Sequence, residues 1–277
     1  MPKAMNIERR ITFFLGEEGI PAWMLNRLKT LAHYFKAVVV MRNISRLNIA
    51  NAEQPMQMMS LGSRPGDLCQ LLIEGTDAEL ACMTLTNFIA EHCRLINSSY
   101  RQQPHRPTPT TPLPFPFSLH HLAPCTDKNA QLQAISRLVI IAEKEQQDAP
   151  PHPDDIATAT RQLFEQLTAR ESVSSTAMGN GIALPHVLSP LVSQPHISVT
   201  ALDTPLDWGS QRGPVHRIVG LVLPAPPQRP HLEAFSSFSQ QLLVTKYCQA
   251  LGDNTHPDVL EAIIVHALAA PFDRRAP

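Results

Sequence analysis

The sequence predicts two consecutive domains, an α+β domain of order βαββαβα and a following α/β domain. Its length of 277 residues is enough for two hydrophobic cores of ordinary size. Prolines 104, 107, 109, 112, 114 and 116 separate the two parts. Proline fixes φ and removes a backbone donor, so this stretch is neither a helix nor an inner strand. We expect a first domain over residues 1–96, an extended linker over 97–114 and a second domain over 115–272.

Apolar periodicity defines the elements of the first domain. Leu25, Leu28 and Leu31 recur at helical spacing between residues 22 and 35. Thr76 or Asp77 can cap the helix that begins at residue 78. The expected strands span residues 11–15, 37–41, 47–50 and 69–73, and the helical segments span 22–35, 56–61 and 78–92. This order predicts a compact sheet with helices on one face.

The second domain alternates helices with apolar strands, which is typical of α/β structure. Thr126 can cap a helix over residues 129–144, and Asp154 or Asp155 can cap a helix over 156–169. A glycine-rich loop follows at 179–181. We then expect strands at 197–202 and 217–223 and helices at 232–252 and 257–268.

Composition excludes several classes of protein. The apolar fraction is 43% and the charged fraction 17%, which indicates a globular chain. A formal net charge of −1 gives no global field for nucleic acid, so we expect no nucleic-acid partner. The apolar run from Ile11 to Leu15 is too short for a signal peptide, and no stretch approaches the ~20 apolar residues of a membrane span. We therefore expect a cytoplasmic protein.

The cysteines give no sign of a metal or redox site. No two of them have C-x-x-C spacing, which argues against a zinc knuckle or a redox dithiol. They stand at positions 69, 82, 93, 125 and 248. Isolated thiols of this kind are typical of buried residues in a reducing compartment. We expect no metal and no cofactor.

The densest group of chemically useful residues runs from Arg170 to His186. A helix ends near Arg170, a loop of small residues follows, and the Pro185–His186 pair closes it. Glycines 179 and 181 allow positive φ and close approach of a ligand to the backbone. There is no Walker lysine and no third glycine, so we reject a nucleotide site.

This region resembles the active-site signature of fructose/mannitol-type enzyme IIA domains of the bacterial sugar phosphotransferase system. The matching motifs keep their order along the chain: Asp127–Lys128, Arg170–Glu171, Ser175–Thr176, Gly179–Ala183, Pro185–His186, Thr204–Trp208 with Pro214–Val215, and Leu223–Pro224 through His231–Leu232. The resemblance implies a mixed sheet flanked by helices. It departs from the family pattern at Val187–Leu188, where small or polar residues are usual.

The resemblance also implies site residues. His186 is the expected phosphohistidine, and Arg170 and His231 are expected to line the phosphate pocket. A neutral imidazole is nucleophilic near neutral pH, and a guanidinium offers paired donors to phosphate oxygens. His196 and His216 have no expected role.

The first domain resembles HPr, the small phosphocarrier that feeds enzyme IIA, with its open-faced sandwich. The supporting stretches are 32–35 with 37–40, 59–62, 64–67 and 75–79. Pro21 stands where the phosphorylated histidine of HPr is expected, Trp23 where its arginine is expected, and Gln54 near the regulatory serine of some relatives. We expect an HPr-like domain without the HPr chemistry. Trp23 either forms part of a docking surface or packs against its own core or the linker.

The resemblance implies a phosphoryl carrier that takes phosphate from phospho-HPr on His186 and passes it to a IIB component. Contact with a membrane sugar permease would then be peripheral, through IIB. Proteins that join HPr, enzyme I and IIA modules are the multiphosphoryl transfer proteins, and the enzyme I module is absent from this sequence. Two alternatives stay open: a regulator of the nitrogen-type IIA kind whose phosphorylation controls binding to another protein, and a decaying multidomain protein.

Overall fold

The computed structural model describes residues 7–100, 112–146 and 152–273. Prolines 104, 107 and 109 of the predicted linker lie outside these ranges. Contacts divide the chain into two compact units, one of Met1–Pro112 with Asp258–Ala267 and one of Leu113–Pro257 with Leu268–Pro277. None of the helices in the described ranges is long and apolar enough to cross a membrane.

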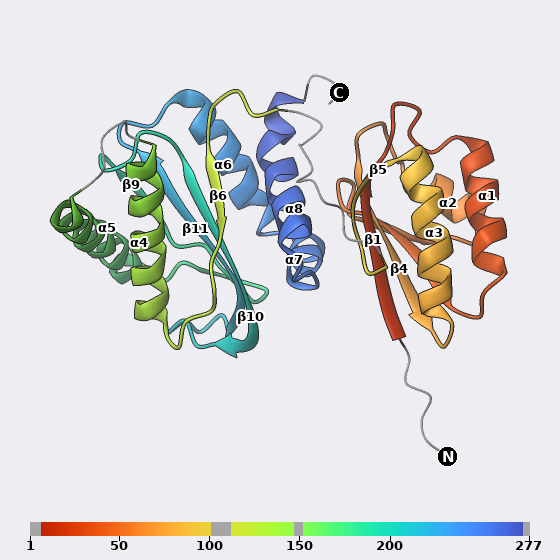
Figure 1. Ribbon diagram of the computed structural model, residues 1–277, viewed down its shortest axis with the longest axis horizontal. Coiled ribbons are helices and arrows are strands. Elements are labelled where there is room, and N and C mark those ends of the chain that lie inside the picture. The colour runs from red at the N-terminus through yellow and green to blue at the C-terminus, as the bar shows by residue number, and fades with distance from the viewer. Residues whose placement is uncertain (1–6, 101–111, 147–151, 274–277) are drawn as a thin grey trace, which may run out of the picture. The chain divides into compact units, whose positions relative to one another are not determined.

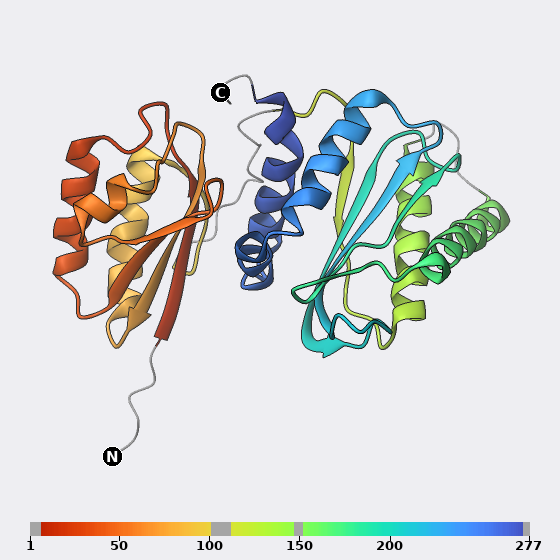
Figure 2. The same cartoon turned by 180° about the vertical axis from the view of Figure 1, so that it is seen from behind.

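In the described part of the first unit, five strands form one open antiparallel sheet in the order β3-β2-β4-β1-β5. Helices α1, α2 and α3 cover one face of it (Figures 1 and 2). The elements are β1 (Ile7–Phe14), α1 (Ala22–His33), β2 (Val38–Asn43), β3 (Asn48–Asn51), α2 (Pro55–Met59), β4 (Leu68–Gly75), α3 (Ala78–His92) and β5 (Arg94–Ser98). The predicted order βαββαβα is confirmed, and β5 follows it as an unpredicted edge strand that runs past residue 96.

The core of this unit lies between the sheet and its helices. Leu28 of α1, Phe13 of β1 and Leu85 of α3 are at most 1% exposed and belong to one apolar cluster. Asp77 is the N-cap residue of α3, but its carboxylate accepts the backbone N–H groups of Lys36 and Ala37, both at 2.8 Å. The carboxylate therefore ties the start of α3 to the segment before β2 and does not cap its own helix.

In the described part of the second unit, six strands form a mixed open sheet. Its path is β6-β10-β11-β8-β7, and β9 also pairs with β11. Helices α4 and α5 cover one face and α6 lies on the other (Figures 1 and 2). The elements of this unit are β6 (Ser118–His121), α4 (Lys128–Glu145), α5 (Pro153–Val173), β7 (Ala177–Gly179), β8 (Ile182–Ala183), β9 (His186–Ser189), β10 (His196–Leu206), β11 (Val215–Pro224), α6 (Arg229–Gln241), α7 (Thr245–Gly252) and the 3-10 turn Ala270–Phe272. Helix α8 (Pro257–Ala269) follows α7 along the chain, and its residues Asp258–Ala267 are grouped with the first unit.

The helix predicted over residues 232–252 is wrong as one element, because the chain breaks between α6 and α7. Leu243 and Val244 donate to the carbonyls three residues earlier, Gln240 and Gln241, which tightens the end of α6 into a turn. At the far end of α7, the guanidinium of Arg217 donates hydrogen bonds to the carbonyls of Leu251 and Gly252, at 3.2 and 2.7 Å. No glycine or proline marks this break in the sequence.

The predicted helix caps also differ from the observed ones. The carboxylate of Asp127, not the hydroxyl of Thr126, accepts the Ala130 N–H at 2.9 Å and caps α4. Helix α5 begins at Pro153, and His152 is its N-cap residue in place of Asp154 or Asp155. Proline at the first helical position needs no hydrogen-bond acceptor, so it suits the start of α5.

A buried polar cluster joins α4 to β10. Glu143 Oε2 lies 2.9 Å from Nε2 of His196, and Oε1 accepts the N–H and hydroxyl of Ser193 at 2.9 and 2.6 Å. Nδ1 of His196 lies 3.4 Å from Nε2 of His120, and the two rings stack. Burial raises the pKa of Glu143, but the hydrogen bonds from Ser193 and His196 outweigh it and leave this pKa below its ordinary value. Burial lowers the pKa of His196, and Glu143 offsets this only in part.

Acid should destabilise the second unit through this cluster. The unfolded chain protonates His196 near pH 6.5, roughly the value of a free histidine, whereas the folded chain resists its protonation. The unfolded state therefore binds more protons below about pH 6.5, and the stabilisation present above that pH is lost as the pH falls. We expect the free energy of unfolding to drop between pH 7 and 5.5, and His196→Gln to flatten this drop.

Urea unfolding at several pH values measures both effects. Glu143→Ala should cost about 1–3 kcal/mol at pH 7, because it leaves buried donors unpaired. Glu145→Ala, an exposed carboxylate on the same helix, is the control and should change little. An unchanged pH dependence in His196→Gln would contradict this account.

Candidate functional site

His186 opens β9 and is held against β11. It pairs with Leu221 in the parallel ladder, and the Leu221 N–H donates to the Pro185 carbonyl at 2.8 Å. Leu184 and Pro185 separate β9 from β8, which pairs with the same strand. Proline has no N–H for the ladder, so the edge of the sheet is broken there. His186 therefore follows directly on a break in the sheet.

The imidazole of His186 has a defined tautomer. Its Nδ1 lies 2.8 Å from the carbonyl oxygen of Leu184. A carbonyl oxygen can only accept, so Nδ1 carries the ring proton. Nε2 then keeps its lone pair, which is the form of histidine that acts as a nucleophile.

Arg170 lies at the other side of this ring. It belongs to the last turn of α5, and its Nε–H donates to Nε2 of His186 at 3.3 Å. Its Nη1 donates to the carbonyl and the hydroxyl of Ser174, at 3.2 and 3.3 Å, which fixes the plane of the guanidinium. Nη2 has no protein partner among the described residues. A guanidinium whose Nη2–H groups are unpaired, and whose Nε–H can turn from the ring to an oxygen, is suited to bind two oxygens of one phosphoryl group.

His231 lies in the first turn of α6 and is only 3% exposed. Its Nδ1 accepts the backbone N–H of Gln228 at 3.4 Å, as part of a capping box, and its ring packs edge-on against Phe115 at 4.6 Å between centroids. Among the described residues, no hydrogen bond joins it to His186 or Arg170. Burial lowers the pKa of His231, which favours the neutral ring. Its role at the phosphate stays a prediction.

The glycine-rich loop forms the tight turn between β7 and β8. Asn180 and Gly181 both have positive φ, 52° and 76°. A Cβ at Gly181 would lie 1.9 Å from Cε1 of His216. The sequence suggested that a ligand approaches the backbone closely at this loop. In the structure the ring of His216 fills the space over Gly181 instead.

An apolar groove of about 330 Å³ lies beside His186. Leu188 and Leu232 line it with 47% and 51% of their surfaces exposed, and Ser236 and Ser239 also line it. The unusual Val187–Leu188 pair thus makes the surface beside the histidine apolar. Exposed apolar side chains around a polar centre are typical of protein–protein contacts.

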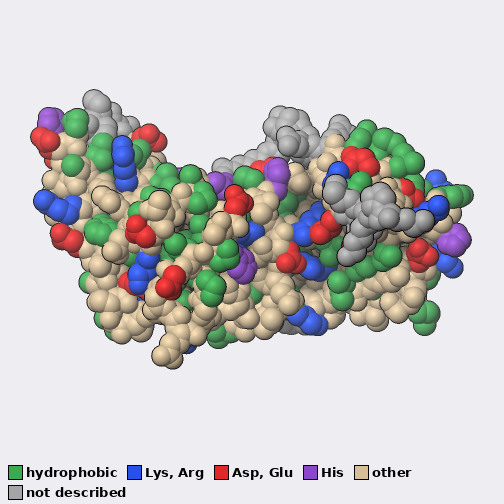
Figure 3. Space-filling model, turned by 90° about the horizontal axis from the view of Figure 1, so that it is seen from below, with side chains coloured by type: hydrophobic (Ala, Val, Ile, Leu, Met, Phe, Trp, Pro, Cys, Tyr) green, Lys and Arg blue, Asp and Glu red, His purple; other side chains and the backbone are tan. Residues whose placement is uncertain are grey.

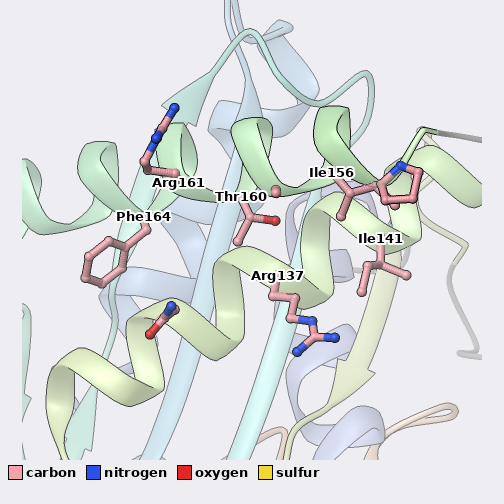
Figure 4. A pocket seen from close by; sticks show the side chains of 9 residues that line it. Arg137, Ile141, Ile156, Thr160, Arg161 and Phe164 are labelled. Carbon is pink, nitrogen blue, oxygen red and sulfur yellow. The ribbon is translucent and has the colours of Figure 1, made fainter.

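A larger hollow of about 630 Å³ lies elsewhere, between α4 and α5. Figure 4 shows Ile141, Ile156 and Phe164 along it, with Arg137 and Arg161 on different helices. Its described lining contains the hydroxyl-bearing Thr160 but no histidine, cysteine or carboxylate that could activate a nucleophile as a general base.

The first unit lacks the chemistry of a phosphocarrier at the expected place. Pro21 is the N-cap residue of α1 and has no side-chain nitrogen. Trp23 is 49% exposed and packs edge-on against Phe88 and His92 of α3, with ring centroids 6.4 and 4.8 Å away. Trp23 therefore packs in part against its own domain, and the docking alternative stays a prediction.

The described ranges give no sign of a metal centre. No group of three or more His, Cys, Asp or Glu side chains within them could hold a metal ion. On the face drawn in Figure 3, acidic and basic side chains of the described residues are interspersed and do not gather into one patch of a single sign.

Two protein families match the chain. The family described as the phosphoenolpyruvate-dependent sugar phosphotransferase system EIIA 2 matches residues 152–267. The family described as the HPr component phosphorylation site of the phosphotransferase system matches residues 16–91. The second description names a phosphorylation site, whereas this chain has Pro21 at the expected position.

Individual relatives match only part of the chain. The multiphosphoryl transfer protein of Shigella flexneri is 32% identical over 90 residues, which are 32% of this chain and 11% of that protein. The nitrogen regulatory protein of Pseudomonas aeruginosa is 37% identical over 81 residues, 29% of this chain and 53% of that protein. The crystal structure of nitrogen regulatory protein IIA-Ntr from Neisseria meningitidis is 23% identical, with a TM-score of 0.43, over 53% of this chain and 95% of that one. The chain thus spans only about a tenth of the first of these curated relatives.

The sequence motifs, the two sheets and the two family matches agree on the organisation of the molecule. The chain consists of an HPr-like domain followed by a domain of the phosphotransferase-system EIIA 2 family.

Proposed function

We propose that the chain is a phosphoryl carrier in which His186 accepts a phosphoryl group from phospho-HPr and passes it to a IIB component. The observation that carries this proposal is the pair of contacts on the ring, Nδ1–H to the Leu184 carbonyl and Arg170 Nε–H to Nε2. They favour Nε2 as the attacking atom and put a cation beside it.

The transfer step follows from these contacts. The Nε2 lone pair attacks the phosphorus while the N–P bond of the donor histidine breaks, and the donor keeps the electron pair of that bond. The proton on Nδ1 stays in place, so the phosphorylated ring carries positive charge, which the Leu184 carbonyl stabilises. Arg170 turns its donors from Nε2 to the phosphoryl oxygens. Positioning and charge stabilisation supply most of the catalysis in such transfers.

The next acceptor takes the group by the same reaction in reverse. The apolar groove with Leu188 and Leu232 supports docking of protein partners at His186, because an apolar surface beside the histidine can be covered by another protein. A IIB protein fits this role if the chain serves sugar uptake, and membrane contact would then be indirect.

A regulatory function is the second candidate. It is favoured by the 37% identity to the nitrogen regulatory protein of Pseudomonas aeruginosa and by the apolar Val187–Leu188 pair after the histidine. In this case phosphorylation of His186 would switch the binding of another protein at the groove. Two measurements on a captured partner separate the two functions: whether it removes the phosphate from His186, and whether its affinity depends on phosphorylation. A IIB component removes the phosphate. A regulated target leaves the phosphate in place, and its affinity for the chain changes with phosphorylation.

The HPr-like domain is proposed to dock and not to carry phosphate. Pro21 cannot be phosphorylated, and Trp23 presents an aromatic surface where HPr presents a cation. Large, rigid aromatic side chains are efficient anchors in interfaces.

His186→Ala should abolish acid-labile, base-stable phosphorylation of the chain by enzyme I, HPr and phosphoenolpyruvate, because no other nitrogen holds its place beside Arg170. Incorporation of labelled phosphate measures this. His121→Ala, an exposed histidine of the same unit, is the control and should be labelled normally. Labelling of His186→Ala at the wild-type level would refute the assignment.

Arg170→Ala and His231→Ala should slow transfer by roughly one to three orders of magnitude, in line with the loss of one preorganised donor. Arg170→Lys should restore only part of the rate, since an ammonium lacks the paired donors of the guanidinium. Rapid-quench measurements of the transfer rate in each variant test this prediction. Thermal unfolding of His231→Ala must be measured beside them, because this ring also caps α6. Wild-type rates in both alanine variants would mean that the two residues are structural.

With enzyme I and phosphoenolpyruvate alone, the full chain should take up no phosphate. When HPr is added, the chain should become phosphorylated. Neither Pro21 nor Trp23 can relay the group. Labelling of wild-type chain and of His186→Ala, each with and without HPr, measures this. Label on the wild-type chain without HPr would make the HPr-like domain an active relay.

A further inference from the structure

Four segments that the sequence analysis matched to family motifs meet at one carboxylate, that of Glu171. Both of its oxygens lie 3.2 Å from the backbone nitrogen of Thr176, and Oε2 also accepts the Thr176 hydroxyl. Nζ of Lys128, at the start of α4, lies 3.7 Å from Oε1. The indole Nε1–H of Trp208 donates to Thr176 Oγ1 at 3.2 Å, and Lys128 donates to the Trp208 carbonyl at 3.1 Å.

Three of the four residues in this ring are buried, and the side chain of Lys128 is 29% exposed. Glu171 is 8% exposed, Thr176 3% and Trp208 0%. A carboxylate taken out of water needs hydrogen bonds and a compensating charge, and here it has two donors from Thr176 and a neighbouring ammonium. The ring therefore holds α4, the end of α5, the loop before β7 and the segment after β10 in one fixed arrangement.

The arrangement leads directly to the histidine. The backbone carbonyl of Thr176 accepts the Leu184 N–H at 2.9 Å. The carbonyl of the same Leu184 accepts Nδ1–H of His186. Arg170, whose Nε–H contacts the other ring nitrogen, is the chain neighbour of Glu171. Both sides of the imidazole are thus attached to the same carboxylate, one through Thr176 and Leu184 and one through the backbone of α5.

We propose that Glu171 is a positioning residue for His186: with Thr176, Trp208 and Lys128 it holds the Leu184 carbonyl where it fixes the proton on Nδ1, and holds Arg170 where it faces Nε2. Glu171 does not touch the phosphoryl group. Its effect on transfer rests on the proposed function, but its effect on the tautomer of His186 does not.

The test uses the full chain with Glu171→Gln, Thr176→Val and Thr176→Ser. Ring ¹⁵N chemical shifts of unphosphorylated His186 report which nitrogen carries the proton, and transfer kinetics from phospho-HPr report rate and KM. Glu171→Gln and Thr176→Val should mix the two tautomers and lower the transfer rate constant roughly 10- to 100-fold, the scale of a small misplacement, with little change in KM. Thr176→Ser keeps the hydroxyl and should restore both readouts. Glu165→Gln, an exposed carboxylate on the same helix, is the control and should change neither.

The outcomes separate this inference from the proposed function. If the wild-type chain takes up no phosphate but Glu171→Gln has an altered tautomer of His186, the proposed function is wrong and the inference holds. A wild-type tautomer in both Glu171→Gln and Thr176→Val overturns the inference, whatever the transfer rates are. If Glu171→Gln does not fold, Thr176→Val against Thr176→Ser decides alone, because these two differ by little more than the hydroxyl.

Discussion

The site depends on the backbone carbonyl of Leu184. It lies in the break between β8 and β9, where Pro185 interrupts the ladder on β11, and it faces Nδ1 of the histidine two residues later. A side-chain acceptor could rotate away or titrate, whereas a backbone carbonyl held by the sheet does neither. The proton on Nδ1, the lone pair on Nε2 and the use of Arg170 all follow from this one hydrogen bond. In turn Leu184 is held through its own N–H by Thr176, and Thr176 by the buried carboxylate of Glu171.

The side chains expected to handle a phosphoryl group lie in only one of the two domains. The EIIA 2 domain has the histidine, the guanidinium and an apolar groove beside them. The HPr-like domain has the sheet and helices, with Pro21 and Trp23 at the start of α1. Its fold needs neither histidine nor arginine there, because Trp23 packs against Phe88 of the apolar core and α1 begins at Pro21 without a side-chain cap. The absence of a phosphorylatable side chain at Pro21 is therefore compatible with a stable domain, for which docking is the proposed role.

Long periodic elements and ordered motifs were predictable from the sequence; contacts between distant segments were not. Helix α4, strand β11 and the pairing of Arg170 with His186 follow from spacing and from the family resemblance. The strands β7 to β9 are too short to show a period of two, and they exist because β11 and the turn at Gly181 hold them. The break between α6 and α7 has no glycine or proline to mark it. The ring around Glu171 joins Lys128, Thr176 and Trp208 from separate segments, so only the fold brings them together. For His231 the sequence prediction and the structure differ. Its motif predicts that it lines the phosphate pocket, whereas its hydrogen bond caps α6.

The central claim is that Nε2 of His186, and no other ring nitrogen, receives the phosphoryl group. The most direct measurement is the one-bond coupling between ³¹P and ¹⁵N in chain labelled with ¹⁵N-histidine and phosphorylated by enzyme I, HPr and phosphoenolpyruvate. The account predicts a single phosphohistidine, coupled at Nε2 of His186, with Nδ1 still protonated. Phosphate coupled to Nδ1 of His186, or to any other histidine, would contradict it.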